Sequence, residues 1–184
     1  MTYTLLRQNG SADSWMALAV EQIPRLALLS GAPLEGIVEP VRVVLAAGRD
    51  AVSDYLELPC AVVSDRMRNA LDHARVDNIQ YLRATLEQRV SERTFTGYWI
   101  ANVFGALACV DRQASQIEDE SANYAGALRS FQIDPRRTYD LSLFRIAEDR
   151  RLIAVHERVR SVLERAQLRG VLFQAPADYD GHPV

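Results

Sequence analysis

The sequence of 184 residues contains no lysine, and all 21 of its basic residues are arginine. A guanidinium is a planar fork that pairs with carboxylates in a bidentate way, which an ammonium does poorly. A GC-rich genome produces the same bias without any functional cause, so composition alone does not identify a function. The formal net charge of −3 argues against general binding of nucleic acid or of anionic membranes.

Cysteine and long apolar runs are also scarce. The two cysteines, Cys60 and Cys109, lie in separate apolar stretches, and a disulfide framework needs more cysteines in a shorter chain. We therefore expect reduced, buried thiols. The N-terminus lacks the basic start and apolar stretch of a signal peptide. No apolar run approaches the roughly 20 residues that span a bilayer. These features predict a soluble, cytoplasmic protein.

The residues of common catalytic and metal sites do not occur in their usual patterns. The three histidines, His73, His156 and His182, are not spaced as metal ligands, and no GxSxG motif or phosphate-binding glycine-rich loop is present. The cysteines and histidines are too scattered for a zinc site. His73 falls late in an expected helix and His156 at the N-cap of another, where both suit structural roles. The sequence predicts no enzyme, cofactor or metal ion.

The composition that is present, 48% hydrophobic and 24% charged, is typical of a globular domain. The stretch TYTLL at residues 2–6 predicts a strand that ends in turn residues. SWMALAVEQI at residues 14–23 suggests one or two helical turns. Residues 26–50 contain glycines and prolines around short apolar runs, which favours short strands separated by turns.

Two later stretches each read as strand, helix and strand. In the first, residues 60–63 form a strand, Ser64 is the N-cap of a helix, and residues 78–82 are extended. In the second, residues 152–155 form a strand, a helix follows His156 and stops at Gly170, and residues 171–173 form a strand. Val63 aligns without gaps with Val155, 92 residues further on. The similarity reflects either duplication or coincidence between two amphipathic helices.

These patterns predict the fold class. We expect an α+β protein with a mostly antiparallel sheet and two similar strand–helix–strand units whose helices pack on the sheet. A β-meander between residues 127 and 155 would lead into the second helix.

Two charged clusters are candidates for partner binding. Glu118, Asp119 and Glu120 form the densest acidic run, which is either a solvated loop or a recognition patch for a basic partner. Arg136 and Arg137 form a basic counterpart on a turn, with the same two interpretations.

The stretch YWIANVFGALACVD, residues 98–111, is apolar on both faces of a strand except at Asn102. A polar group in such a segment needs partners, so we expect Asn102 to bond to neighbouring backbone. A buried helix is the alternative, because a run this apolar carries no decisive period. Asp111 is predicted to form a turn or cap at the end of the segment.

The order of these segments resembles a bacterial family called immunity protein eleven. The similarity covers roughly residues 50–173, and the matching positions are Tyr98, Asn102, Asp111, Ser115, Phe144, Arg145, Gly170 and Phe173. The resemblance implies a protein that binds and neutralises the toxin encoded beside it in the producing cell. The family offers no catalytic residues, so these positions are transferred as structural ones.

We therefore predict a single domain of residues 1–184. It would have variable N-terminal strands and turns at 1–50, a family-like core at 51–173 and an exposed tail at 174–184. The leading function is a non-enzymatic immunity protein whose partner is a cognate toxin. The alternatives are an interaction or regulatory module without a toxin, and an enzyme. An open pocket that joins Asp111, His156 and Arg145 would favour the enzyme.

Overall fold

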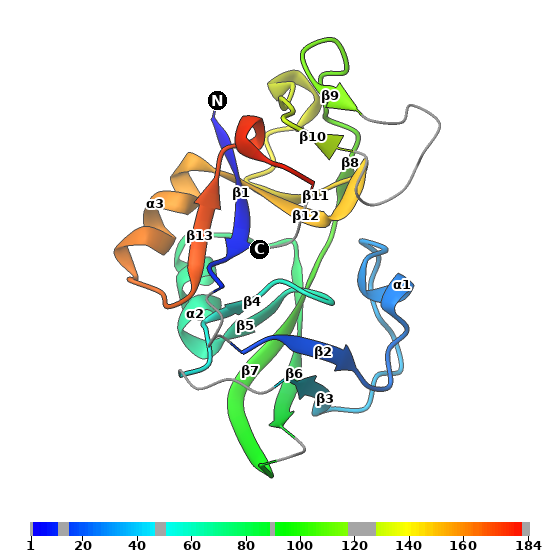
Figure 1. Cartoon of the computed structure of the whole chain (residues 1–184), viewed down its shortest axis with the longest axis vertical. Coiled ribbons are helices and arrows are strands. Elements are labelled where there is room, and N and C mark those ends of the chain that lie inside the picture. Colours follow the sequence, from blue (N-terminus) through cyan, green and yellow to red (C-terminus); the bar gives the residue numbers. More distant parts are fainter. Residues whose placement is uncertain (1, 11–14, 47–50, 89–90, 118–127, 182–184) are drawn as a thin grey trace.

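The computed structural model describes residues 2–10, 15–46, 51–88, 91–117 and 128–181, and its strands form two main sheets (Figure 1). The first sheet has six strands in the order β2-β3-β6-β7-β5-β4. In chain order these are β2 (Ala17–Val20), β3 (Val41–Leu45), β4 (Tyr55–Leu56), β5 (Val62–Ser64), β6 (Ile79–Gln88) and β7 (Arg93–Val103).

The second sheet has five strands in the order β13-β1-β12-β11-β8. They are β1 (Tyr3–Gln8), β8 (Ala106–Leu107), β11 (Leu143–Ile146), β12 (Asp149–His156) and β13 (Val171–Gln174). A separate ribbon pairs β9 (Gln116–Ile117) with β10 (Leu128–Arg129). Only β3–β6 and β8–β11 are parallel among the described pairs. The α+β prediction is confirmed, but the strands form two mixed sheets where one was expected.

Helices α2 (Asp65–His73) and α3 (Glu157–Arg165) each begin directly after a strand. The Ser64 hydroxyl accepts a hydrogen bond from the Met67 N–H, and Nδ1 of His156 accepts one from the Arg158 N–H. Each side chain thus satisfies a backbone donor that has no partner inside its helix. Both predicted N-caps are confirmed.

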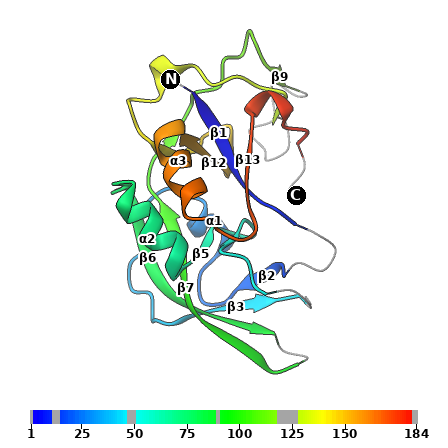
Figure 2. The same ribbon diagram turned by 90° about the vertical axis from the view of Figure 1, so that its left-hand side faces the viewer.

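The two helices lie side by side, and a hydrophobic cluster beneath them joins the two sheets (Figure 2). Met67 and Leu71 of α2 and Val159 and Leu163 of α3 are fully buried at helical spacing. They pack in one cluster with residues of both sheets, including Val103 of β7 and Val155 of β12. None of the described helices has the length and apolarity needed to cross a membrane.

The two edges of the six-stranded sheet are linked by the Gln8 side chain. Its amide nitrogen donates to the carbonyl of Trp15, which precedes β2, over 2.9 Å. Its amide oxygen accepts from the N–H of Glu57, which follows β4, over 3.1 Å. Because Gln8 is buried, both bonds form away from water, and β1 thereby holds the first sheet in a curled shape.

Two N-terminal predictions are wrong. Residues 17–20 were expected in a helical turn, but they form β2, whose Val20 pairs with Val43 of β3. Residues 26–28, expected in strands and turns, belong to the short helix α1 (Arg25–Leu28). A four-residue apolar run has no decisive period, so tertiary pairing determined its conformation.

The C-terminal predictions also need correction. Helix α3 ends at Arg165, well before Gly170, which lies in the turn to β13 with a φ of +69°. The residues after β13 are not uniformly exposed, because Tyr179 is 3% exposed and packs edge-to-face on Phe131. An aromatic residue in the final segment thus belongs to the core.

Asn102 and Asp111 have the structural roles predicted for them. Asn102 is 1% exposed in β7, and its Nδ2 donates to the Ala32 carbonyl over 2.8 Å. The Asp111 carboxylate accepts from the backbone N–H groups of Gln113 and Ala114, which closes a turn. The strand interpretation of residues 98–103 is confirmed over the helical one.

Candidate functional site

Of the five predicted partner-binding residues, only the two arginines lie in the described part of the chain. Glu118, Asp119 and Glu120 lie outside the described residues. Arg136 and Arg137 end the short helix η1 (Pro135–Arg137), and their side chains are 89% and 60% exposed. Their charged ends are therefore available at the surface.

Asp134 orients both guanidinium groups. Its carboxylate accepts from Nε and Nη2 of Arg136, each over 3.1 Å, and lies 3.6 Å from Nε of Arg137. It also accepts from the Arg136 N–H and so caps η1. Hydrogen bonding to Arg136 lowers the pKa of Asp134 and raises that of Arg136. The two exposed guanidinium groups thus share the Asp134 carboxylate, and Arg136 also feels the charge of Asp111.

Tyr139 lies next to these arginines and is 79% exposed. Its φ of +49° is unusual for a large side chain and fixes how the ring projects from the turn. Arg137, Tyr139 and residues 106–108 line a cavity of about 480 Å³. We call Arg136, Arg137, Tyr139 and residues 106–108 the arginine–tyrosine surface. Tyrosine and arginine are the residue types that most often dominate protein–protein binding energies.

A second cavity, of about 350 Å³, lies between α3 and β13. Arg160, Leu163 and Glu164 line it from the helix, and Val171, Leu172 and Phe173 line it from the strand. The Arg160 guanidinium stacks over the Phe173 ring at 5.5 Å and pairs with Glu164 at 2.7 Å. We call this cavity the α3–β13 groove. No pattern in the sequence had indicated this groove.

A third, smaller cavity of about 200 Å³ is lined by Tyr3, Asp140, His156 and Arg158. Nδ1 of His156 is occupied by its bond to the Arg158 N–H, which fixes the ring as a helix cap. The Tyr3 ring packs edge-to-face on His156, and its hydroxyl donates to the Leu141 carbonyl over 2.9 Å. These contacts give His156 and Tyr3 structural roles.

The three residues that would favour an enzyme have separate surroundings. His156 lines the third cavity, and Asp111 closes its own turn. Arg145 is 1% exposed and donates to the carbonyls of Arg150 and Leu28. Burial lowers the Arg145 pKa. Arg145 thus fastens α1 to the second sheet and takes no part in an open site.

In the described part of the chain, the two cysteines and the possible metal ligands lack the features of reactive thiol and metal sites. Cys60 and Cys109 are free and buried, and burial raises the pKa of each thiol to about 12. Such thiols remain protonated at neutral pH and are poor nucleophiles and ligands. The described residues contain no group of three or more histidine, cysteine or acidic side chains that could hold a metal ion.

The chain is thus an α+β protein that exposes arginine and tyrosine side chains and an apolar groove, which are features of protein-binding surfaces. The model of the immunity protein family (Imm11) matches residues 21–178, most of the chain, and the chain belongs to this family. The match confirms the resemblance suggested by the sequence and reaches further toward both ends than residues 50–173. No match was found among curated proteins.

Proposed function

We propose that this protein binds a cognate bacterial toxin domain in the producing cell and neutralises it by covering a surface that the toxin needs for activity. Membership of an immunity protein family across residues 21–178 carries this proposal. Neutralisation would follow from a specific interface with buried anchor residues and a polar rim. The protein would act as a cytoplasmic, single-domain binder.

We propose the arginine–tyrosine surface as part of that interface. Asp134 already holds Arg136 and Arg137 in place, so less side-chain entropy is lost when a partner binds them. Tyr139 adds a large, exposed ring beside the arginines. The acidic residues Glu118, Asp119 and Glu120 stay a prediction for contact with a basic part of the toxin.

The direct test is co-expression with the toxin encoded beside this chain. We expect restored growth and a complex that survives size-exclusion chromatography. Absence of both, with the correct toxin, would contradict the proposed function.

The double variant Arg136→Glu/Arg137→Glu should bind the toxin about 100-fold more weakly, because each reversal removes an anchor worth at least about 1.4 kcal/mol. Both side chains are exposed, so the melting temperature should change little. Arg25→Glu on α1 is the matched control, since Arg25 is also exposed. Calorimetric titration measures the three affinities. Equal affinity of the double variant and the control would exclude the arginines from the interface.

We also propose that the two strand–helix–strand segments, β5–α2–β6 and β12–α3–β13, are copies of one unit. In each, the two strands flank a third, antiparallel strand: β7 lies between β5 and β6, and β1 between β12 and β13. Arg68 stacks over Tyr81 as Arg160 does over Phe173. Matching registers and stacks at a constant offset support duplication over coincidence.

A further inference from the structure

Strand β13 forms an outer edge of the five-stranded sheet and pairs only with β1 among the described strands. The Asn9 N–H donates to the Gly170 carbonyl over 2.9 Å, so these two residues are a hydrogen-bonded pair of the antiparallel ladder. Hydrogen-bonded and non-hydrogen-bonded pairs then alternate along the two strands. Leu172 and Gln174 therefore direct their backbone groups toward β1. Val171 and Phe173 direct theirs to the free edge, where they have no hydrogen-bond partner among the described residues.

The chemistry of this edge suits the addition of another strand. Residues 171–174 contain no charge and no proline, which are the usual means of blocking an edge. Leu172 is 39% exposed. The α3–β13 groove runs beside the edge, with Leu163, Val171 and Phe173 as its apolar lining. An added strand would place alternate side chains in such a groove.

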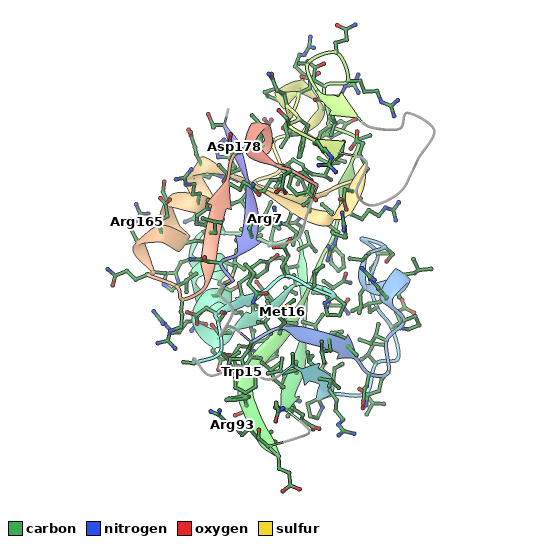
Figure 3. The ribbon with its side chains drawn as sticks, in the orientation of Figure 1. Arg7, Trp15, Met16, Arg93, Arg165 and Asp178 are labelled. Carbon is green, nitrogen blue, oxygen red and sulfur yellow. The ribbon has the colours of Figure 1, made fainter. Side chains whose placement is uncertain are left out.

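The charge around the groove indicates what kind of segment fits. Arg160 is paired with Glu164, and Arg66 with Asp54. Arg165 and Arg169 are exposed and form no ion pair with the described residues; Figure 3 shows Arg165 on the outer side of α3. Neither of them lines the groove, but each directly follows a residue that does, Glu164 and Leu168, so the surface beside the groove has an excess of positive charge. Such a surface repels a second copy of itself and attracts carboxylates.

The first sheet contains a comparable edge that the chain covers itself. Strand β6 follows α2 as β13 follows α3, and its outer edge is met by residues 34–44. The Glu39 carboxylate accepts from the Arg83 N–H over 2.7 Å, and β3 then pairs with β6 in parallel. Against such an edge this fold thus already places a segment that contributes the Glu39 carboxylate and continues as an extended strand, β3.

We infer that the toxin docks by adding an extended segment to the free edge of β13, with an apolar side chain in the α3–β13 groove and carboxylates on Arg165 and Arg169. This inference rests on the proposed function. The β13 edge and the arginine–tyrosine surface are separate contact areas, because β13 and β8, which contributes residues 106–107, are opposite edges of the five-stranded sheet.

Amide hydrogen exchange, resolved by residue with NMR, tests the inference in the purified complex with the toxin. In the free protein the amides of Val171 and Phe173 should exchange quickly, while those of Leu172 and Gln174 are already protected by β1. Binding should slow exchange at Val171 and Phe173 about tenfold or more. A complex that leaves both rates unchanged would overturn the inference while the proposed function stands, whereas absence of any complex counts against the proposed function.

Substitutions of exposed side chains provide a second test, and they leave the backbone of β13 unchanged. Arg165→Glu/Arg169→Glu should weaken toxin binding about tenfold or more and reduce its salt dependence, because two favourable charge contacts become repulsive. Leu172→Glu should weaken binding more than Leu172→Arg, since only the former repels a carboxylate. Arg25→Glu is again the control. Equal effects of Leu172→Glu and Leu172→Arg, with no effect of the double reversal, would reject an acidic strand at this edge.

Discussion

Replacing Arg7 with methionine is expected to destabilise the protein by about 3–5 kcal/mol, because the change leaves a buried carboxylate without its cation. The side chains of Arg7 and Glu57 are 1% and 5% exposed. Figure 3 shows Arg7 near the middle of the molecule, on β1. Nε of Arg7 lies 3.0 and 3.1 Å from the two Glu57 oxygens. The Gln8 N–H also donates to Glu57 over 3.0 Å, so the pair connects β1 to the end of β4. Equilibrium unfolding in urea measures the loss.

Two further variants make this prediction specific. Arg7→Met/Glu57→Leu should be less destabilised than Arg7→Met alone, because it removes the uncompensated charge along with its partner. Arg83→Met breaks the exposed pair with Glu39, in which the Arg83 side chain is 70% exposed, and should cost at most about 1 kcal/mol. If Arg7→Met costs no more than Arg83→Met, the buried pair does not stabilise the fold as proposed.

Gly170→Ala is expected to destabilise the protein by about 3 kcal/mol, through backbone strain together with steric overlap. Gly170 has a φ of +69°, and a Cβ there would lie 2.5 Å from Ser53 Cβ and overlap Ser53 Oγ. Ser53 is buried and has little room to move. The overlap would displace the turn that leads into β13. Thermal and urea unfolding measure the effect.

The control for this change is Gly36→Ala. Gly36 has a φ of +67°, and nothing lies within 4 Å of the position of its Cβ. Its replacement should cost only the backbone strain, about 1–2 kcal/mol. Adding Ser53→Gly to Gly170→Ala should recover part of the lost stability by removing the overlapping atoms. Equal losses at Gly170 and Gly36, with no recovery, would show that Ser53 does not constrain the turn.

Local patterns in the sequence predicted the parts of the fold that depend on neighbouring residues. Ser64 and His156 were identified as N-caps because a capping side chain bonds to a backbone N–H within two or three residues. Asp111 was placed in a turn for the same reason. Asn102 was predicted to bond to backbone because it interrupts a segment that is apolar on both faces. The family, too, was suggested by the order of such local segments.

The candidate surfaces were predicted only in part. Arg136 and Arg137 were predicted as a basic pair on a turn that could bind a partner; the structure places them at the exposed end of η1, and partner binding stays a prediction. Tyr139 was missed, although an aromatic residue in the polar turn PRRTYD was the signal that could have identified it. Nothing in the sequence indicated the α3–β13 groove, because a free strand edge is defined by which strands do not pair with it.

The sequence alone was enough to locate the starts of α2 and α3 and to suggest the family, whereas it left a strand and a buried helix open for residues 98–103. The tertiary structure alone decided that the strands divide into two sheets, that β2 is a strand, and that Arg7 meets Glu57. The physical reason is the range of the interactions. Caps and alternating patterns act over a few residues, whereas strand order and buried ion pairs join residues that are distant in the chain and gain their energy only after folding.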